Sequence, residues 1–168
     1  MLSVIILCGG ASAEAMVRTL TPLVAAAVRG LVRDVVLAGR PEDQLAIIAD
    51  HAGCACVEAA SEAEALRAAV AISRGGALMI LYAGHIPEPG FFEEVEDLLA
   101  VGLPSAQGRS LRAAPEKFLE RLFPQLAPCV GLIAARRLCA QTDIASFRQL
   151  CTVTRAKTSL RRRLRRIV

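Results

Sequence analysis

The chain has 168 residues, of which 54% are hydrophobic and 21% are charged, and its formal net charge is +4 at pH 7. This composition excludes an intrinsically disordered chain, a collagen-like fibre and a small disulfide-rich scaffold. The mean hydropathy is high, at +0.46, but no apolar run approaches the roughly 18 residues that a transmembrane helix needs. These properties predict one soluble domain over residues 1–168.

The cysteines and histidines show no metal-site or disulfide-framework spacing. The six cysteines, at positions 8, 54, 56, 129, 139 and 151, form no C-x-x-C motif, and the two histidines are His51 and His85. We therefore expect reduced cysteines and no metal site. The apolar run Leu2–Leu7 lacks a basic flank and is too short for a signal peptide, so the sequence favours a cytoplasmic protein.

Strand and helix patterns alternate through the first half of the chain. The apolar run Ser3–Leu7 predicts a buried strand that ends at Cys8-Gly9-Gly10. Ser12 can cap a helix running to about Arg29, with a kink or break expected at Pro22. The elements expected next are a strand at Asp34–Ala38, a helix from Pro41 to about Gly53, a strand at Cys54–Glu58, a helix at Glu62–Ser73 and a strand at Ala77–Tyr82.

Weaker patterns follow in the second half. The elements expected there are a helix at Phe91–Val101, a loop at Pro104–Arg112, a helix near Pro115–Leu122, a strand at Cys129–Ala135 and a short helix after Arg136. The alternation predicts an α/β fold in which helices cover a mostly parallel sheet. Ligands of such sheets bind beyond the carboxyl ends of the strands, so functional residues are expected at that edge.

Five stretches of the chain carry a family resemblance in a fixed order. They are Leu2–Ile6, Leu31–Leu37, Glu64–Gly75, Leu78–Gly90 and Val130–Leu138. In this order they resemble the family 2 glycosyltransferases, enzymes of the GT-A fold that use nucleotide-diphosphate sugars. The resemblance implies a three-layer α/β/α domain with a mostly parallel twisted sheet, and a nucleotide-diphosphate sugar bound at its carboxyl edge.

The family's acidic residues are missing from the corresponding positions. Tyr82 and Gly84 stand where the family's metal-binding DXD carboxylates would be, and Gly39 stands near the position of an acid that contacts the nucleotide base. Asp43 could replace that acid only by a shift of several residues. A bound Mg²⁺ or Mn²⁺ is therefore not expected, because such ions prefer oxygen ligands. Arg74 or the basic C-terminal tail would then stabilise the diphosphate.

No catalytic base can be assigned either, because Asp143 is the one acid after Cys139. The resemblance therefore implies a glycosyltransferase that is either degenerate or metal-independent. A second hypothesis is a non-catalytic binding or scaffold protein on the same fold. The pattern favours no particular donor sugar, acceptor or oligomeric state.

A glycine turn supports a third hypothesis. The segment Ile6–Ser12, followed by Thr21-Pro22-Leu23, resembles the glycine-rich opening of the molybdenum-cofactor nucleotidyltransferases, although Glu14 stands near an expected Arg. Backbone N–H groups in such a turn can bind phosphate. The residues predicted to contact a nucleotide are Cys8, Gly9, Gly10, Gly39, Asp43, Arg74, Tyr82, Gly84 and His85. Two of them have structural alternatives, since His85 could pack on neighbouring prolines and Tyr82 could belong to the core.

The C-terminal tail is strongly basic. Leu160, Leu164 and Ile167 have helical spacing, which predicts an amphipathic basic helix over residues 155–168. The arginines around them are Arg161, Arg162, Arg163, Arg165 and Arg166. Such a helix can bind an anionic membrane surface, which would place the protein peripherally at the inner face of the membrane. The alternative is packing of the leucines onto the mildly acidic body. Nucleic-acid binding is disfavoured, because no aromatic residues are interleaved with the arginines.

Overall fold

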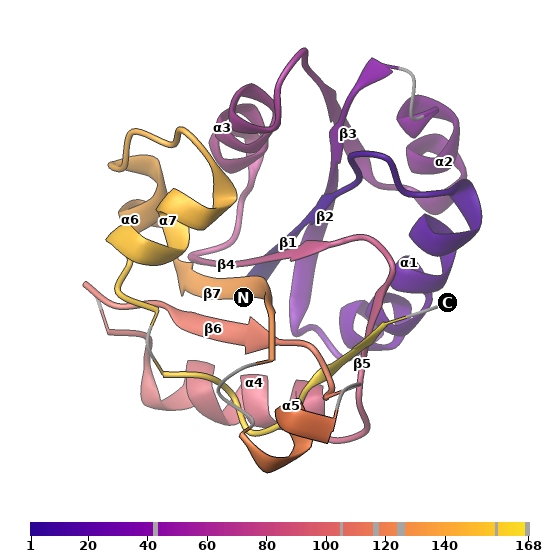
Figure 1. Cartoon of the computed structure of the whole chain (residues 1–168). Helices are drawn as coiled ribbons and strands as arrows, with labels where there is room; N and C mark the ends of the chain where they lie inside the picture. The colour runs from indigo at the N-terminus through magenta and orange to yellow at the C-terminus, as the bar shows by residue number, and fades with distance from the viewer. Residues whose placement is uncertain (42–43, 105, 116–117, 124–126, 157, 167–168) are drawn as a thin grey trace.

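The chain folds around a six-stranded sheet (Figure 1), and the computed structural model describes residues 1–41, 44–104, 106–115, 118–123, 127–156 and 158–166. The central strand β1 (Leu2–Leu7) pairs in parallel with β2 (Val32–Gly39) and β4 (Ala77–Tyr82). The remaining strands of this sheet are β3 (Ala55–Glu58), parallel to β2, β7 (Cys129–Ala135), antiparallel to β4, and β6 (Arg109–Arg112), antiparallel to β7. The strand order is therefore β3-β2-β1-β4-β7-β6.

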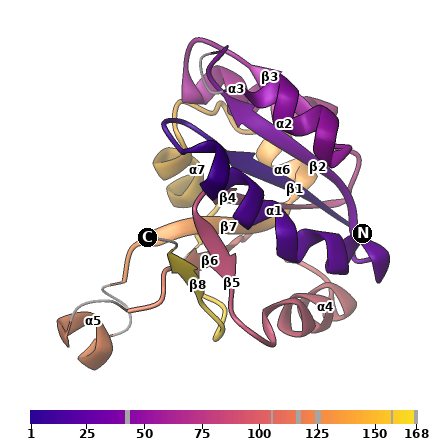
Figure 2. The ribbon, with the colours of Figure 1, turned by 90° about the vertical axis from the view of Figure 1, so that its right-hand side faces the viewer.

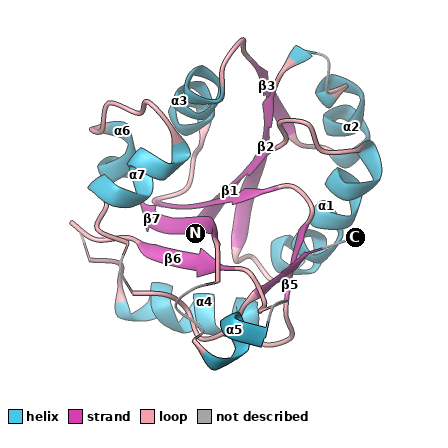
Figure 3. Ribbon diagram, in the orientation of Figure 1, coloured by secondary structure: helices cyan, strands magenta, loops and turns pink. Residues whose placement is uncertain are grey.

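Helices cover both faces of this sheet (Figure 3). One face packs on α1 (Ala13–Val28), α2 (Leu45–Ala52) and α4 (Phe91–Val101). The other packs on α3 (Glu62–Ile72), α6 (Arg136–Ala140) and α7 (Phe147–Val153). A short helix, α5 (Phe118–Leu122), leaves most of its apolar side chains exposed. The predicted fold class, a three-layer α/β/α arrangement with a mostly parallel sheet, is confirmed.

Local sequence signals explain the first crossover. The side chain of Ser12 accepts a hydrogen bond from the backbone N–H of Ala15 at 3.2 Å and so caps α1. The helix continues through Pro22, so the chain does not break there, and the kink expected as the alternative stays a prediction. Met16, Leu20 and other apolar residues at helical spacing turn one side of α1 into the core.

The strand register brings four carboxyl ends to one edge of the sheet. Leu7 pairs with Ala38 on one side and with Tyr82 on the other. Gly39 pairs with Glu58 of β3 one step further along the same edge. Loops that follow these residues therefore lie next to one another, as the rule for parallel sheets requires.

The C-terminal segment is not the predicted helix. Residues 164–166 form the strand β8 (Leu164–Arg166), which pairs antiparallel with β5 (His85–Pro87), as Figure 2 shows. Residues 158–163 are turns and extended chain, and Ile167 lies outside the described residues. The spacing of Leu160 and Leu164 suits a helix, but residues four apart also share one face of an extended chain. Both leucines are buried, which supports packing onto the body.

Carboxylates of the body hold this extended tail. Glu94 of α4 accepts the backbone N–H groups of Arg161 and Arg162 at 2.8 and 2.9 Å. Glu88 accepts the backbone N–H of Arg163 at 3.1 Å. Such bonds are open only to a chain whose N–H groups are not already used inside a helix, so they favour the extended form. No helix within the described residues is long and apolar enough to cross a membrane.

Candidate functional site

The structure brings most of the predicted nucleotide-contacting residues to the carboxyl edge. Cys8, Gly9 and Gly10 follow β1, Gly39 ends β2, and Tyr82, Gly84 and His85 lie at or after the end of β4. Arg74 is the exception, because it precedes β4 and lines a hollow at the opposite edge together with Gly76 and Arg136. The prediction that Arg74 faces the same site is therefore wrong, since a residue before a parallel strand lies at the amino end of that strand. Asp43 lies outside the described residues.

A first cavity at this edge, here called the glycine hollow, has a volume of about 290 Å³. Its lining includes Gly9, Gly10, Gly39, Arg40 and Glu62. Gly10 adopts φ +74°, a backbone conformation that favours glycine. A Cβ added at Gly9 or Gly10 would meet no atom within 4 Å. The turn after β1 therefore leaves open space next to backbone groups, which suits the close approach of a ligand.

A second cavity, here called the His85 hollow, has a volume of about 510 Å³. It is lined by residues that include Gly84, His85, Glu120, Val130 and Arg166. The two hollows share the turn between β1 and α1, because Gly10 lines the first and Ala11 lines the second.

His85 is half-buried, and its Nδ1 lies 3.1 Å from the backbone oxygen of Tyr82. Gly84, with φ +86°, donates its backbone N–H to the hydroxyl of Thr19 at 2.9 Å. These contacts fix the turn that carries His85 against α1. The predicted nucleotide contact of His85 stays a prediction.

Tyr82, which the sequence resemblance aligned with a metal ligand, makes structural contacts. Its hydroxyl donates to Glu62 Oε2 at 3.2 Å, and the backbone N–H of Phe147 donates to Glu62 Oε1 at 3.2 Å. The rings of Tyr82 and Phe147 meet edge to face with centroids 5.1 Å apart. Burial raises the pKa of Tyr82, and the negative charge of Glu62 raises it further. Tyr82 therefore remains a neutral phenol that joins β4 to α3 and α7.

One arginine and one glutamate line each of the two hollows. Among the described residues, no group of three or more His, Cys, Asp or Glu is placed to hold a metal ion. Arg40 lines the glycine hollow and Arg166 lines the His85 hollow. Glu62 lines the glycine hollow too, and its two oxygens accept the bonds from Tyr82 and Phe147.

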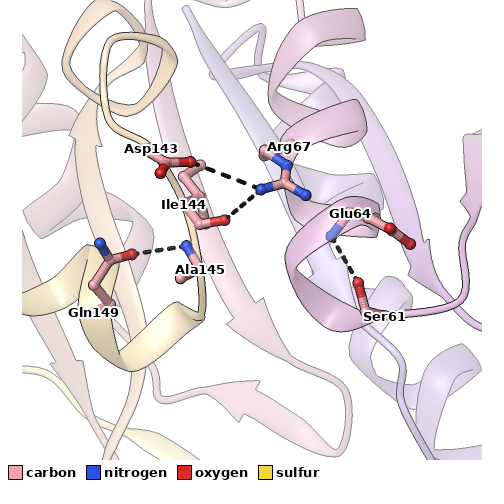
Figure 4. A network of polar contacts seen from close by, with 7 residues as sticks. All are labelled: Ser61, Glu64, Arg67, Asp143, Ile144, Ala145 and Gln149. Carbon is pink, nitrogen blue, oxygen red and sulfur yellow. Dashed lines mark hydrogen bonds and ion pairs between the residues drawn. The ribbon is translucent and has the colours of Figure 1, made fainter.

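Asp143, the one late acid, does not reach either hollow. Figure 4 shows it beside Arg67 of α3, with 3.8 Å between Asp143 Oδ1 and Arg67 Nη1. The same nitrogen donates to the backbone oxygen of Ile144 at 3.0 Å, while Gln149 Oε1 accepts from the backbone N–H of Ala145 at 2.8 Å. These bonds fasten the loop before α7 to α3. Asp143 is highly exposed, so this contact is a surface tie and not a catalytic arrangement.

Sequence reasoning missed three charged residues that line the hollows: Arg40, Glu62 and Glu120. Arg40 could have been found, because it directly follows the strand end at Gly39. Glu62 is the first residue of α3, after the N-cap Ser61. Its place at the start of a helix already explained the residue, so nothing in the sequence indicated a role in a site. Glu120 comes from a distant part of the chain, and no local pattern indicates its place.

Comparison with solved structures identifies the fold. Glucosyl-3-phosphoglycerate synthase from Mycobacterium tuberculosis superposes with a TM-score of 0.58 at 21% identity, over 82% of this chain and 57% of that one. Mannosyl-3-phosphoglycerate synthase from Rubrobacter xylanophilus gives 0.59 at 18% identity, over 82% and 54%. The fold is that of the nucleotide-diphospho-sugar transferases. No protein-family model matches this sequence, and neither does any curated protein.

A smaller neighbour matches more of the chain. 4-Diphosphocytidyl-2C-methyl-D-erythritol synthase from Anaerococcus prevotii superposes with a TM-score of 0.63 at 8% identity, over 99% of this chain and 89% of that one. By contrast, the chain spans little more than half the length of the two sugar-transferring synthases. All these identities are low, so the likeness establishes the fold and leaves the activity to be inferred from the site.

Proposed function

We propose that this protein binds the nucleoside diphosphate of a nucleotide sugar at the carboxyl edge of its sheet, as a family 2-like glycosyltransferase that holds no metal. The observation that carries the proposal is the glycine hollow, an open cavity of about 290 Å³ beside Gly9 and Gly10. A structure of the Mycobacterium tuberculosis synthase, a protein of the same fold, contains uridine diphosphate and Mn²⁺.

The charges at the edge support a diphosphate without a cation. The first N–H groups of α1 have no partner inside the helix, and the helix dipole favours an anion there. Arg40 and Arg166 bring guanidinium groups to the two hollows. Tyr82 and Gly84 supply no carboxylate, so the described residues do not fit a bound Mg²⁺ or Mn²⁺. Arginine would then stabilise the charge that develops on a departing diphosphate.

Calorimetric titration with UDP- and GDP-sugars, with and without Mn²⁺, tests this proposal. We expect a dissociation constant of roughly 1 mM or lower that Mn²⁺ changes by less than about twofold. Binding that requires Mn²⁺ would refute the metal-free form of the proposal. Absence of binding to any nucleotide would refute the proposal itself and favour a scaffold protein.

Two matched glycine variants locate the binding. Leucine at Gly9 would enter the glycine hollow, whereas leucine at Gly76 would stand at the opposite edge. A Cβ at either position meets nothing within 4 Å, and neither glycine has a positive φ, so both variants are expected to fold. We expect Gly9→Leu to weaken binding at least about tenfold and Gly76→Leu to leave it unchanged. If both substitutions weaken binding equally, the ligand does not bind in the glycine hollow.

A second candidate function is nucleotidyl transfer. The match with 4-diphosphocytidyl-2C-methyl-D-erythritol synthase covers 99% of this chain and 89% of that protein. The matches with the two longer synthases cover 82% of this chain and 57% and 54% of those proteins. The glycine turn after β1 also resembles that of the molybdenum-cofactor nucleotidyltransferases. Titration with CTP and GTP distinguishes the two functions, because tighter binding of a triphosphate than of any nucleotide sugar would favour nucleotidyl transfer.

Contact between the tail and an anionic membrane surface remains a separate prediction. Leu160 and Leu164 are buried, so among the described residues of the tail the contact would fall to the arginines. Arg161, Arg162, Arg165 and Arg166 are exposed. Replacing Arg161 and Arg165 by Glu reverses two exposed charges and keeps the buried leucines, so it should reduce the partition of the protein onto anionic vesicles. Unchanged partition would refute the contact.

A further inference from the structure

Two cysteines face each other near the candidate site. Cys129 is the first residue of β7, Cys151 belongs to α7, and their Sγ atoms lie 4.0 Å apart. Both side chains are partly exposed, so small oxidants and alkylating reagents can reach them. A disulfide needs an S–S distance of about 2.05 Å, so the sulfurs must approach by roughly 2 Å.

The surroundings make the two thiols unequal. The hydrogen bond with Cys151 lowers the pKa of Cys129, and the positive charge of Arg112 lowers it further. Arg112 is Cys129's partner in the β6–β7 ladder, and its Nη1 donates to the backbone oxygen of Ala127 at 2.6 Å. The same hydrogen bond and burial raise the pKa of Cys151. Cys129 is thus the more readily deprotonated thiol of the pair.

The other cysteines lack this arrangement. Cys139 is buried, and burial raises its pKa to about 12. Burial also raises the pKa of Cys54, whose Sγ donates to the backbone oxygen of Ala52. Cys8 is buried and bonds to the backbone oxygen of Ile6. Cysteines of these kinds are unreactive, so they provide internal references within the same chain.

We propose that Cys129 and Cys151 form a reactive thiol pair that a hydroperoxide oxidises to an intramolecular disulfide between β7 and α7. The Cys129 thiolate attacks the terminal peroxide oxygen, and the O–O bond breaks to give a sulfenic acid and hydroxide or alkoxide. The Cys151 thiol then attacks the Cys129 sulfur, an S–S bond forms, and water leaves. In total two thiols and one hydroperoxide yield one disulfide, one water and one water or alcohol.

The position of the pair gives this modification a structural consequence. Pro128 and Val130, on either side of Cys129, line the His85 hollow. Phe147 of α7 packs on Tyr82, whose strand leads directly into Gly84 of the same hollow. A disulfide would therefore tie α7 to the chain that forms one wall of the hollow. The proposal concerns the thiols themselves and does not depend on which nucleotide binds.

Oxidation of the full-length chain with a stoichiometric amount of hydrogen peroxide tests the proposal. We expect the intact mass to fall by about 2 Da and a peptide map to join Cys129 to Cys151. Cys151→Ser should stop at a sulfenic acid on Cys129 that dimedone traps, whereas Cys129→Ser should form no intramolecular disulfide. Cys56→Ser is the matched control, because Cys56 is exposed and its loss should leave the reaction unchanged.

The alternative outcomes are distinct. Oxidation of Cys56 first, or disulfides only between molecules, would overturn the proposal. A second measurement on the unmodified protein avoids reliance on the variants. At neutral pH, iodoacetamide should label Cys129 at least about tenfold faster than Cys54, since alkylation follows the thiolate fraction. Labelling of both at one rate would also overturn the proposal.

Discussion

Replacing Glu62 by Ala tests whether the Tyr82 position is a structural contact of the carboxyl edge. The substitution removes the acceptor of two hydrogen bonds, from the Tyr82 hydroxyl and from the Phe147 N–H, both 3.2 Å long. Hydrogen bonds to a charged group contribute about 1.5–3 kcal/mol when buried, and Glu62 is exposed, so we expect a total loss of roughly 1–2 kcal/mol. For a chain of this size that loss lowers Tm by roughly 2–8 °C.

Alkaline titration of the tyrosine gives a second readout. The chain has one Tyr and no Trp, so ultraviolet absorbance of tyrosinate reports Tyr82 alone. In the wild type, Tyr82 should ionise well above the ordinary pKa of about 10, because burial and Glu62 disfavour the phenolate. Glu62→Ala should move the midpoint of this titration downward, although burial keeps it above the ordinary value.

Glu64→Ala is the matched control, because Glu64 is exposed on the same helix and its backbone N–H, not its carboxylate, bonds to Ser61. An unchanged midpoint in Glu62→Ala, or an equal loss of Tm in both variants, would refute the assigned contact. Either result would mean that Tyr82 does not join β4 to α3 and α7 and is available to face a ligand.

Three further predictions follow from individual contacts. Glu94→Ala should increase tryptic cleavage within residues 161–166 about tenfold relative to Glu93→Ala, because Glu94 accepts two backbone bonds of the tail; equal cleavage of the two variants would contradict this. Gly131→Ala should lower the free energy of unfolding in urea by about 2 kcal/mol or more, since its Cβ would lie 2.7 Å from the backbone oxygen of Ile80; an unchanged denaturation midpoint would contradict it. The rate of Cys129 alkylation should rise with pH, with a midpoint below the usual thiol pKa of 9.0, because the hydrogen bond from Cys151 and the charge of Arg112 lower the pKa of Cys129. The neighbours Tyr82 and Cys139 stay neutral in this range, since burial raises the pKa of each. A midpoint at or above 9.0 would exclude a stabilised thiolate.

The sequence was most informative where local pattern and tertiary position agree. Runs such as Ser3–Leu7 and Ala77–Tyr82 are apolar and bounded by turns, so their burial in the sheet could be read directly, and the structure confirms both strands. The strand β6 was expected to be loop, because Arg109 and Arg112 bracket only Ser110 and Leu111. Its pairing depends on β7, which supplies hydrogen bonds that no local pattern records.

The candidate site could be predicted only from the rule that ligands bind beyond the carboxyl ends of parallel strands. That rule placed Gly9, Gly39 and Gly84 on one edge from sequence alone, because each follows or ends a parallel strand. It could not place the tail, whose Leu160 and Leu164 satisfy both the helical and the extended period. Glu94 of α4 and Glu88 in the loop before it accept backbone N–H groups of the tail and so favour the extended form. In this form Arg166 lines the His85 hollow.

Contacts to the helix α7 order one side of this edge without a carboxylate at Tyr82 or Gly84. In a metal-dependent relative a cation would neutralise and organise the strand ends, whereas here Tyr82 and Glu62 bind the start of α7 and Cys129 contacts Cys151 within it. These contacts occupy one side of the edge. In the proposed function, a bound diphosphate would be neutralised from the other side, where Arg40 and Arg166 line the hollows. Guanidinium groups at a solvent-exposed rim stabilise a departing diphosphate less than a bound divalent cation does. We therefore expect the proposed complex with a nucleotide sugar to transfer its sugar slowly.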